Sequence, residues 1–189
     1  MKLSVHKRTT GTKGETNKLR REGKVPAILY GHNEPGTPVF VSGEEVKAIL
    51  RNIEPGLLAT TVFELDDGHK KHKAIVKEIQ YHVVTYAVEH IDFAIVSNEK
   101  PVTVNVPIQI QGAADCVGVK LGGFIRQPIR SMKVSCLPKD IPQAFVVDVR
   151  ELNIAQSVRL SQIEVPPTVR PLARMNEVAV IIGKKAGAA

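Results

Sequence analysis

The stretch "TTVFELDDGHKKHKAIVKEIQ", residues 60–80, alternates apolar and polar side chains on both sides of Asp67-Gly68. Alternation with a period of two is typical of a β-strand with one buried face, and an Asp-Gly dipeptide supplies the positive φ angles of a tight turn. The stretch therefore predicts a β-hairpin. A second alternating run, "YAVEHIDFAIV" at residues 86–96, predicts a further strand.

One helix is expected ahead of this hairpin. The run "VSGEEVKAILRNI", residues 41–53, begins with Ser42 and has Glu45 three residues later, which predicts a capping box. Val46, Leu50 and Ile53 fall on one helical face. We therefore expect the first half of the chain to be a small β-barrel or rolled sheet with one or two helices.

Four runs of the second half are strand-like, residues 102–112, 123–138, 145–149 and 176–183, and no strong helix is expected there. "RELNIAQS", residues 150–157, predicts at most one helical turn, and "GVKLGG", residues 118–123, predicts a turn that enters a strand. The fold class is therefore mainly β. The polar, Pro-containing stretch "IVSNEKPVT" and the absence of histidine after position 90 place a domain boundary near residue 96, giving domains 1–95 and 96–189.

Composition narrows the class of protein. With 189 residues and 43% hydrophobic side chains, the chain is expected to be globular. It has no apolar run of about 18 residues and no apolar stretch at its start, so we expect a cytoplasmic protein without a membrane partner. We expect Cys116 and Cys136 to be buried thiols, and we expect no metal and no cofactor.

Positive charge gathers near the start of the chain. The formal net charge is +7, and residues 1–24 hold eight of the basic side chains against two acidic ones. The charges of the second half are spread singly. A focused positive charge indicates a polyanionic partner. Aromatic residues make up only 4%, which argues against a broad base-stacking platform.

The focus lies in "TGTKGETNKLRREGKVPAILYG", residues 10–31. A helix from Gly14 to Glu22, closed by Gly23 and stopped by Pro26, is expected there. Leu19 is its single sizeable apolar residue. Helical spacing places a set of polar and cationic side chains on or beside one face: Lys13, Asn17, Lys18, Arg20, Arg21 and Lys24.

Two interpretations of this cationic helix remain open, a solvated surface and an RNA contact. The Gly and Thr residues of "TTGTKGET", residues 9–16, allow close backbone approach and offer amide and hydroxyl donors. Tyr30 ends the adjoining strand, where its ring could meet a base or a sugar. Donors, guanidinium groups and one aromatic ring together favour structured RNA.

The motif "EHID" places His90 and Asp92 on the same face of a strand. Three interpretations compete: a catalytic pair, a surface ion pair and an RNA contact. A catalytic pair needs a nucleophile, and no motif such as GxSxG is present, so we expect no catalytic residues. His69 and His72 in "GHKKH" are expected on opposite strand faces, which argues against a metal site.

The segment "KLRREGKVPAILYG", followed about 60 residues later by "IQYH" and "EHIDF", resembles the family of the general stress protein Ctc and bacterial large-subunit ribosomal protein number twenty-five. In the second half "GVKLGG", "VSCLPKDIP", "VDVREL" and "VRLSQI" look like the extra β domain of its long, two-domain members. Asn17 departs from the basic residue seen in some members, and Ala155 stands where a glycine is usual in the long form.

This resemblance implies a structural ribosomal protein, with no reaction, that binds the loop E region of 5S rRNA in the central protuberance. It implies a monomer within the large subunit, whose C-terminal domain could contact neighbouring rRNA and proteins. A stress-induced factor that binds the same RNA conditionally is the alternative. The RNA-binding positions carried over by motif are Arg8, Lys13, Gly14, Lys18, Arg20, Tyr30, Gln80, His90 and Asp92.

Overall fold

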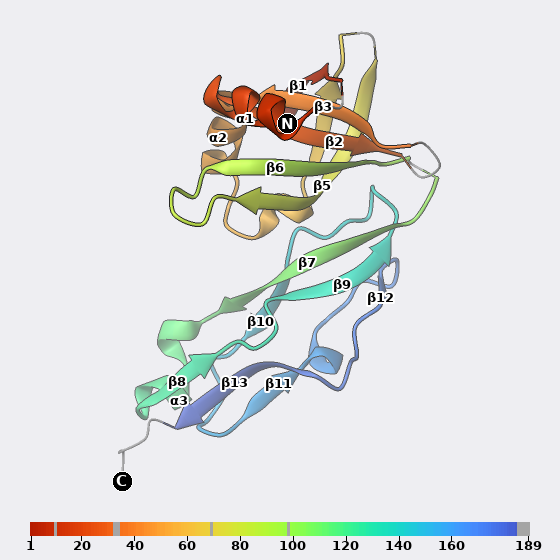
Figure 1. Ribbon diagram of the computed structural model, residues 1–189. Helices are drawn as coiled ribbons and strands as arrows, with labels where there is room; N and C mark the ends of the chain where they lie inside the picture. Colours follow the sequence, from red (N-terminus) through yellow and green to blue (C-terminus); the bar gives the residue numbers. More distant parts are fainter. Residues whose placement is uncertain (10, 32–34, 69, 98, 185–189) are drawn as a thin grey trace. The chain divides into compact units, whose positions relative to one another are not determined.

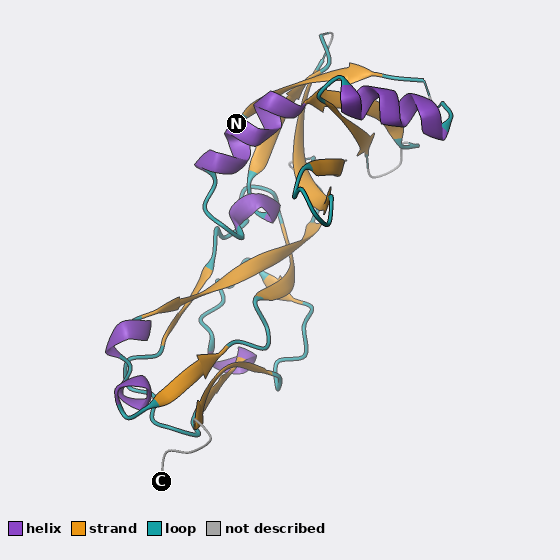
Figure 2. Cartoon of the chain, turned by 60° about the vertical axis from the view of Figure 1, so that its left-hand side comes forward, coloured by secondary structure: helices purple, strands orange, loops and turns teal. Residues whose placement is uncertain are grey.

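A computed structural model describes residues 1–9, 11–31, 35–68, 70–97 and 99–184. The chain divides into two compact units, Met1–Val102 and Thr103–Ala189. Strands predominate in both units, with short helices between them (Figures 1 and 2). The mainly β fold class predicted from the alternation patterns is confirmed.

The first unit is a closed barrel of six strands in the order β1-β3-β2-β6-β5-β4. Parallel pairing of β1 with β4 closes it, and β2 and β6 form a second parallel pair. The elements of this unit are β1 (Lys2–Lys7), α1 (Lys13–Arg21), β2 (Lys24–Tyr30), β3 (Thr37–Ser42), α2 (Gly43–Asn52), η1 (Leu57–Ala59), β4 (Val62–Asp66), β5 (Lys71–Tyr81) and β6 (Val88–Ile95).

The hairpin predicted from residues 60–80 is β4 and β5, which pair antiparallel. Its turn lies one residue later than expected. The Asp67 amide donates to the Lys70 carbonyl at 3.1 Å, and only Gly68 of the predicted dipeptide has a positive φ angle, +78°. The Asp66 carboxylate accepts from the Gly68 amide and fixes the turn. His69 lies outside the described residues.

Helix α2 covers the barrel core with the face that the sequence predicts. Val46 is buried, and Leu50 and Ile53 pack against the buried barrel residues. The predicted capping box is wrong. The Ser42 side chain makes no cap hydrogen bond, and Glu45 Oε2 instead accepts from the Ser4 amide of β1 at 3.3 Å. The glutamate therefore ties the helix to a strand that is distant in sequence.

The second unit contains two sheets, β10-β7-β9-β12 and β11-β13-β8. Its elements are β7 (Val102–Gln111), η2 (Ala113–Asp115), α3 (Val117–Lys120), β8 (Gly123–Arg126), β9 (Ser131–Cys136), β10 (Phe145–Asp148), β11 (Ser157–Arg159), η3 (Leu160–Gln162), β12 (Arg170–Pro171) and β13 (Val178–Lys184). The predicted strands are present. The short β11 and β12 were not predicted, because two or three residues carry no detectable alternation.

Two local features of the second unit bear on the sequence analysis. Cys116 and Cys136 are free and buried, as predicted. Ala155, in the segment 150–157 that forms no helix, has a φ of +68°. This is the left-handed region, which glycine enters without steric cost and alanine does not. The backbone conformation at position 155 therefore favours glycine, the residue that the resemblance implies there.

Candidate nucleic-acid interface

Helix α1 is the predicted cationic helix and is held at the barrel surface with little burial. None of its residues is fully buried, and Leu19 is half-buried. Gly23 follows it with a φ of +75°, as a closing glycine should. The predicted cationic face is wrong in one member. Lys24 is the first residue of β2, and its ammonium group lies 2.9 Å from the Glu22 carboxylate.

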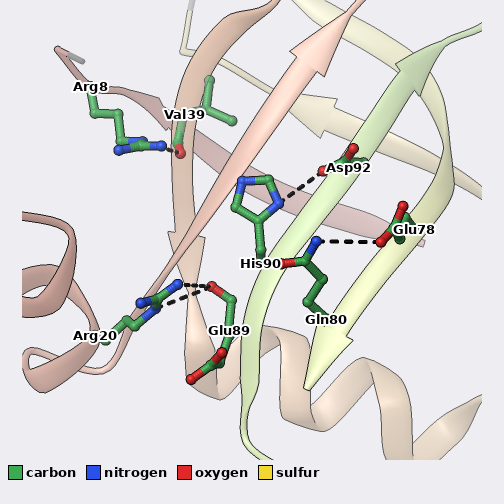
Figure 3. A network of polar contacts seen from close by, with 8 residues as sticks. All are labelled: Arg8, Arg20, Val39, Glu78, Gln80, Glu89, His90 and Asp92. Atoms are coloured by element: carbon green, nitrogen blue, oxygen red, sulfur yellow. Dashed lines mark hydrogen bonds and ion pairs between the residues drawn. The ribbon is translucent and has the colours of Figure 1, made fainter. Parts of the chain in front are cut away.

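Arg20 connects α1 to strand β6. Its Nε and Nη2 atoms both donate to the carbonyl oxygen of Glu89, each at 3.3 Å. Its Nη1 atom donates to Asn17 Oδ1 at 3.4 Å, one helical turn earlier. Figure 3 shows the guanidinium group pointing at the Glu89 carbonyl. The cationic helix is therefore fixed beside the residue that precedes His90.

The outer face of three neighbouring strands lies next to this contact. In β6, Ile91 and Phe93 are buried in the barrel while His90 and Asp92 are only partly buried. The strand pairing places Gln80 of β5 opposite His90. The parallel pairing of β2 with β6 sets Ile28 opposite Asp92 and Tyr30 opposite Ala94. We call α1 together with the outward side chains of β2, β6 and β5 the α1–β6 face.

His90 and Asp92 form a direct contact on this face. The Nδ1 atom of His90 lies 2.8 Å from Asp92 Oδ1, and their side chains are 18% and 31% exposed (Figure 3). Because Nδ1 donates to the carboxylate, Nε2 is the ring nitrogen left to bind another molecule. No hydrogen bond to Nε2 is formed among the described residues. The aspartate therefore sets the orientation of the imidazole.

Two further side chains shape the same surface. The Gln80 amide nitrogen donates to Glu78 Oε1 at 3.3 Å. Burial, followed by the negative charges of Asp92 and Glu78, raises the pKa of the Tyr30 phenol above its ordinary value. The phenol therefore stays protonated near neutral pH and can act as a hydrogen-bond donor.

The remaining predicted residues lie on α1 or along β3. Lys13, Gly14 and Lys18 are exposed on α1. Arg8 follows β1, and its Nε atom donates to the Val39 carbonyl at 3.2 Å. Since β3 pairs with β2, Arg8 is two strands away from β6. The fold thus brings eight of the nine predicted residues to the α1–β6 face and holds Arg8 at β3.

Sequence reasoning missed the groups that position this face. The carbonyls of Glu89 and Val39 hold Arg20 and Arg8, and the Glu78 carboxylate holds Gln80. A backbone carbonyl is present at every residue, so no residue type signals such a partner. Only the alternation of the "VKEIQ" strand, which puts Glu78 and Gln80 on one face, could have indicated the third contact.

No group of three His, Cys, Asp or Glu side chains in the described ranges is arranged to hold a metal ion. No described helix is long and apolar enough to cross a membrane. The molecule is a small, basic, mainly β protein whose cationic helix is fixed to a closed barrel. A focused positive charge of this kind is typical of proteins with a polyanionic partner.

Comparison with known proteins identifies the family. The Ribosomal L25p family matches residues 3–93, and the C-terminal domain of ribosomal protein TL5 matches residues 101–186. The chain is 40%, 41% and 39% identical over 185 residues to large ribosomal subunit proteins bL25 of Chlamydia muridarum, Chlamydia trachomatis serovar L2 and Chlamydia pneumoniae. Each alignment covers 98% of this chain and 100% of the relative.

The chain belongs to the ribosomal L25p family, in its long, two-domain form. The resemblance drawn from the sequence motifs is confirmed. It is a protein of the large ribosomal subunit and not an enzyme. The interpretation of His90 and Asp92 as a catalytic pair is therefore set aside.

Proposed function

We propose that this protein binds 5S ribosomal RNA through the α1–β6 face, at the loop E region in the central protuberance of the ribosome in the cytoplasm. The observation that carries the proposal is the double hydrogen bond from Arg20 to the Glu89 carbonyl. It joins the helix that holds the focused positive charge to the strand that holds His90 and Asp92. Electrostatic attraction and readout of RNA groups thereby act on one ligand.

The helix supplies the sequence-independent part of the binding. Lys13 and Lys18 are exposed and can neutralise phosphates, and the backbone at Gly14 is open enough for a phosphate to approach. A cation on a fixed helix keeps its position relative to the strands, so each phosphate contact also orients the RNA on the barrel.

The strands supply the selective part. His90 presents Nε2, Asp92 presents carboxylate oxygens, and Gln80 presents an amide, all in neighbouring positions of β6 and β5. Tyr30 adds a protonated hydroxyl and a ring face. Such groups recognise the base edges and 2′-hydroxyls that an irregular internal loop of RNA displays and a regular helix hides.

Arg20 on the α1–β6 face, and Arg8 at β3 beside that face, each make two kinds of contact in this proposal. Each guanidinium group uses part of its donor set on a backbone carbonyl, of Val39 or Glu89, and keeps its charge for the RNA. Lysine has no planar fork and could not do both in the same geometry.

The test is the salt dependence of binding to isolated 5S rRNA. If about four or five phosphates are neutralised, the slope of log affinity against log salt is roughly −3 to −4, and Lys18→Ala reduces its magnitude by about 0.7–0.9. Lys47→Ala, which removes the same charge from an exposed position of α2, is the matched control and leaves the slope unchanged. An affinity independent of salt, or equal effects of the two variants, contradicts the proposal.

The second unit is proposed to contact neighbouring rRNA or protein rather than loop E, since its charges are dispersed. We propose that the protein is associated with the ribosome constitutively, whereas a stress-induced factor would associate with it only under stress. Ribosome profiles of unstressed and stressed cells distinguish the two, because a constitutive subunit protein is present at equal stoichiometry in both.

A further inference from the structure

The loop between β5 and β6 presents a cluster of apolar side chains to solvent. Tyr81, Val83, Val84 and Tyr86 are 43%, 87%, 78% and 78% exposed. No Asp, Glu, Lys or Arg occurs in residues 81–88, although 24% of the chain is charged. The loop projects from the barrel at the left of Figure 1, in yellow-green. Apolar groups gathered this closely at an exposed loop are typical of a contact surface.

The loop has a defined conformation that depends on His82. The His82 amide donates to the Ala87 carbonyl at 2.8 Å, and the Tyr86 amide donates to the His82 carbonyl at 2.9 Å. The His82 ring atom Nδ1 accepts from the Val84 and Thr85 amides at 3.3 and 3.2 Å. Tyr86 has a left-handed φ of +53°. The polar backbone groups are thus used within the loop, while the side chains of both valines and Tyr86 point outward.

These contacts reduce the conformational entropy that the loop would lose on binding a partner. A loop that is already closed by backbone and imidazole hydrogen bonds loses less freedom when it docks than an open loop does. A strained tyrosine that is nonetheless exposed is consistent with a side chain placed for a partner rather than for the barrel core. The loop therefore has the properties of a preformed anchor.

We propose that residues 81–86 dock into an uncharged, apolar recess on a neighbouring protein of the large ribosomal subunit. RNA is the less suitable partner, because the loop lacks cations for phosphates and the amides of Val84, Thr85 and Tyr86 are already engaged. Valine has no ring to stack on a base. Valine and tyrosine side chains around a turn do suit a hydrophobic pocket of a protein.

The position of the loop in the barrel favours a partner protein that lies next to the bound RNA. Gln80 pairs with His90 and Tyr81 pairs with Val88, so the loop begins where the α1–β6 face ends. The inference rests on the proposed function here: if the α1–β6 face binds 5S rRNA, the loop lies just beyond the edge of the RNA contact. Its chemistry, apolar and uncharged, is the opposite of that face.

The double variant Val83→Ser/Val84→Ser tests the inference, since it removes the apolar groups and keeps every backbone donor of the loop. Binding of the full chain is measured to large subunits purified from cells that lack this protein, and to isolated 5S rRNA. We expect about tenfold weaker binding to the subunits and unchanged binding to the isolated RNA. Val146→Ser, at an exposed valine of β10, is the control with no effect expected.

A second measurement identifies the occupant. A benzophenone photocrosslinker at position 83 should give a product with a subunit protein that protease destroys and ribonuclease does not. Crosslinking to rRNA, or equal loss of affinity for the subunits and for isolated 5S rRNA, would show that the loop contacts RNA. Sedimentation of the wild-type chain as a dimer that the double variant dissolves would make a second copy the occupant. Unchanged binding to both ligands would mean that the loop docks nowhere.

The outcomes also separate this inference from the proposed function. If the wild-type chain fails to bind isolated 5S rRNA but binds subunits in a manner that depends on Val83 and Val84, the proposed function fails and the docking loop stands. His82→Ala, which removes the acceptor of two loop amides, should weaken subunit binding, and His82→Asn, which keeps a side-chain acceptor, should restore part of it.

Discussion

The guanidinium group of Arg20 donates twice to the carbonyl oxygen of Glu89, at 3.3 Å from both Nε and Nη2. A residue of the cationic helix is thereby held against the backbone of β6, one position before His90. The contact fixes the helix against a strand whose residue Glu89 lies 69 positions later in the sequence. The proposed RNA surface depends on this geometry. A conservative substitution of Arg20 can separate the effect of its positive charge from the effect of its planar guanidinium group.

Arg20→Lys keeps the charge and removes the planar fork. We expect the affinity for 5S rRNA to fall by roughly 1 kcal/mol, about fivefold, while affinity for an unrelated RNA duplex at equal salt stays the same. Arg21→Lys, at the exposed neighbouring position, is the control and should change neither affinity. Equal effects of the two substitutions would mean that Arg20 acts only as a point charge.

Asp92→Ala separates readout from a simple ion pair. The substitution removes the acceptor that orients His90, and it also removes a negative charge near the RNA. Binding to 5S rRNA should weaken by about 1–3 kcal/mol, while binding to an unrelated duplex should strengthen slightly. Glu44→Ala, which makes the same charge change on α2, should affect the two RNAs alike. Stronger binding of Asp92→Ala to both RNAs would reduce the pair to a surface salt bridge, worth about 0–1 kcal/mol.

Gly14→Ala tests the proposed backbone approach at α1. A Cβ atom at Gly14 would meet only Thr12 Oγ1, at 3.7 Å, so the protein itself has room for it. Because alanine favours a helix over glycine, the free energy of unfolding should stay the same or rise by up to about 1 kcal/mol. Affinity for 5S rRNA should nevertheless fall severalfold, since the methyl group occupies the path of a phosphate.

A contrasting glycine gives the control for that substitution. At Gly43 a Cβ atom would lie 2.5 Å from the Gly23 carbonyl oxygen, so Gly43→Ala should lower the free energy of unfolding by about 1–3 kcal/mol. Thermal denaturation and filter binding measure the two effects. If Gly14→Ala binds 5S rRNA as well as the wild type does, the RNA backbone does not pass close to Gly14.

A fragment of residues 1–102 should fold and bind 5S rRNA with nearly the affinity of the full chain, and residues 103–189 should bind it poorly. The barrel and the α1–β6 face lie entirely in the first unit. A fragment of residues 1–95 should be less stable by about 1 kcal/mol, because it lacks Val96, whose amide donates to the Lys73 carbonyl at 2.8 Å. Specific binding by the C-terminal fragment would refute the assignment.

Ala155→Gly should stabilise the second unit. Alanine at a φ of +68° costs about 1 kcal/mol, and glycine removes this cost at the expense of greater freedom in the unfolded chain, so we expect a net gain of about 0.5 kcal/mol. Gly122→Ala is the reciprocal test. Gly122 has a φ of +89° with open space around it, so alanine there should lower the free energy of unfolding by backbone strain alone. Denaturant titration of both variants checks the signs.

The sequence alone determined the longer local elements and the charge. The hairpin of β4 and β5, the apolar face of α2, the end of α1 at Gly23 and the common face of His90 and Asp92 all follow from spacing within a few residues. They were predictable because side-chain periodicity and glycine conformation act locally. The motifs of both halves were also sufficient to indicate the family.

Only the tertiary structure decided which distant groups meet. Arg20 finds the carbonyl of Glu89, Glu45 turns from its own helix cap to the amide of Ser4, and β1 closes the barrel on β4 in parallel. Backbone carbonyls and amides are the same at every residue, and a parallel pair needs a crossover whose length does not specify its partner. These contacts depend on how the whole chain packs, which is why no short stretch of sequence contains them.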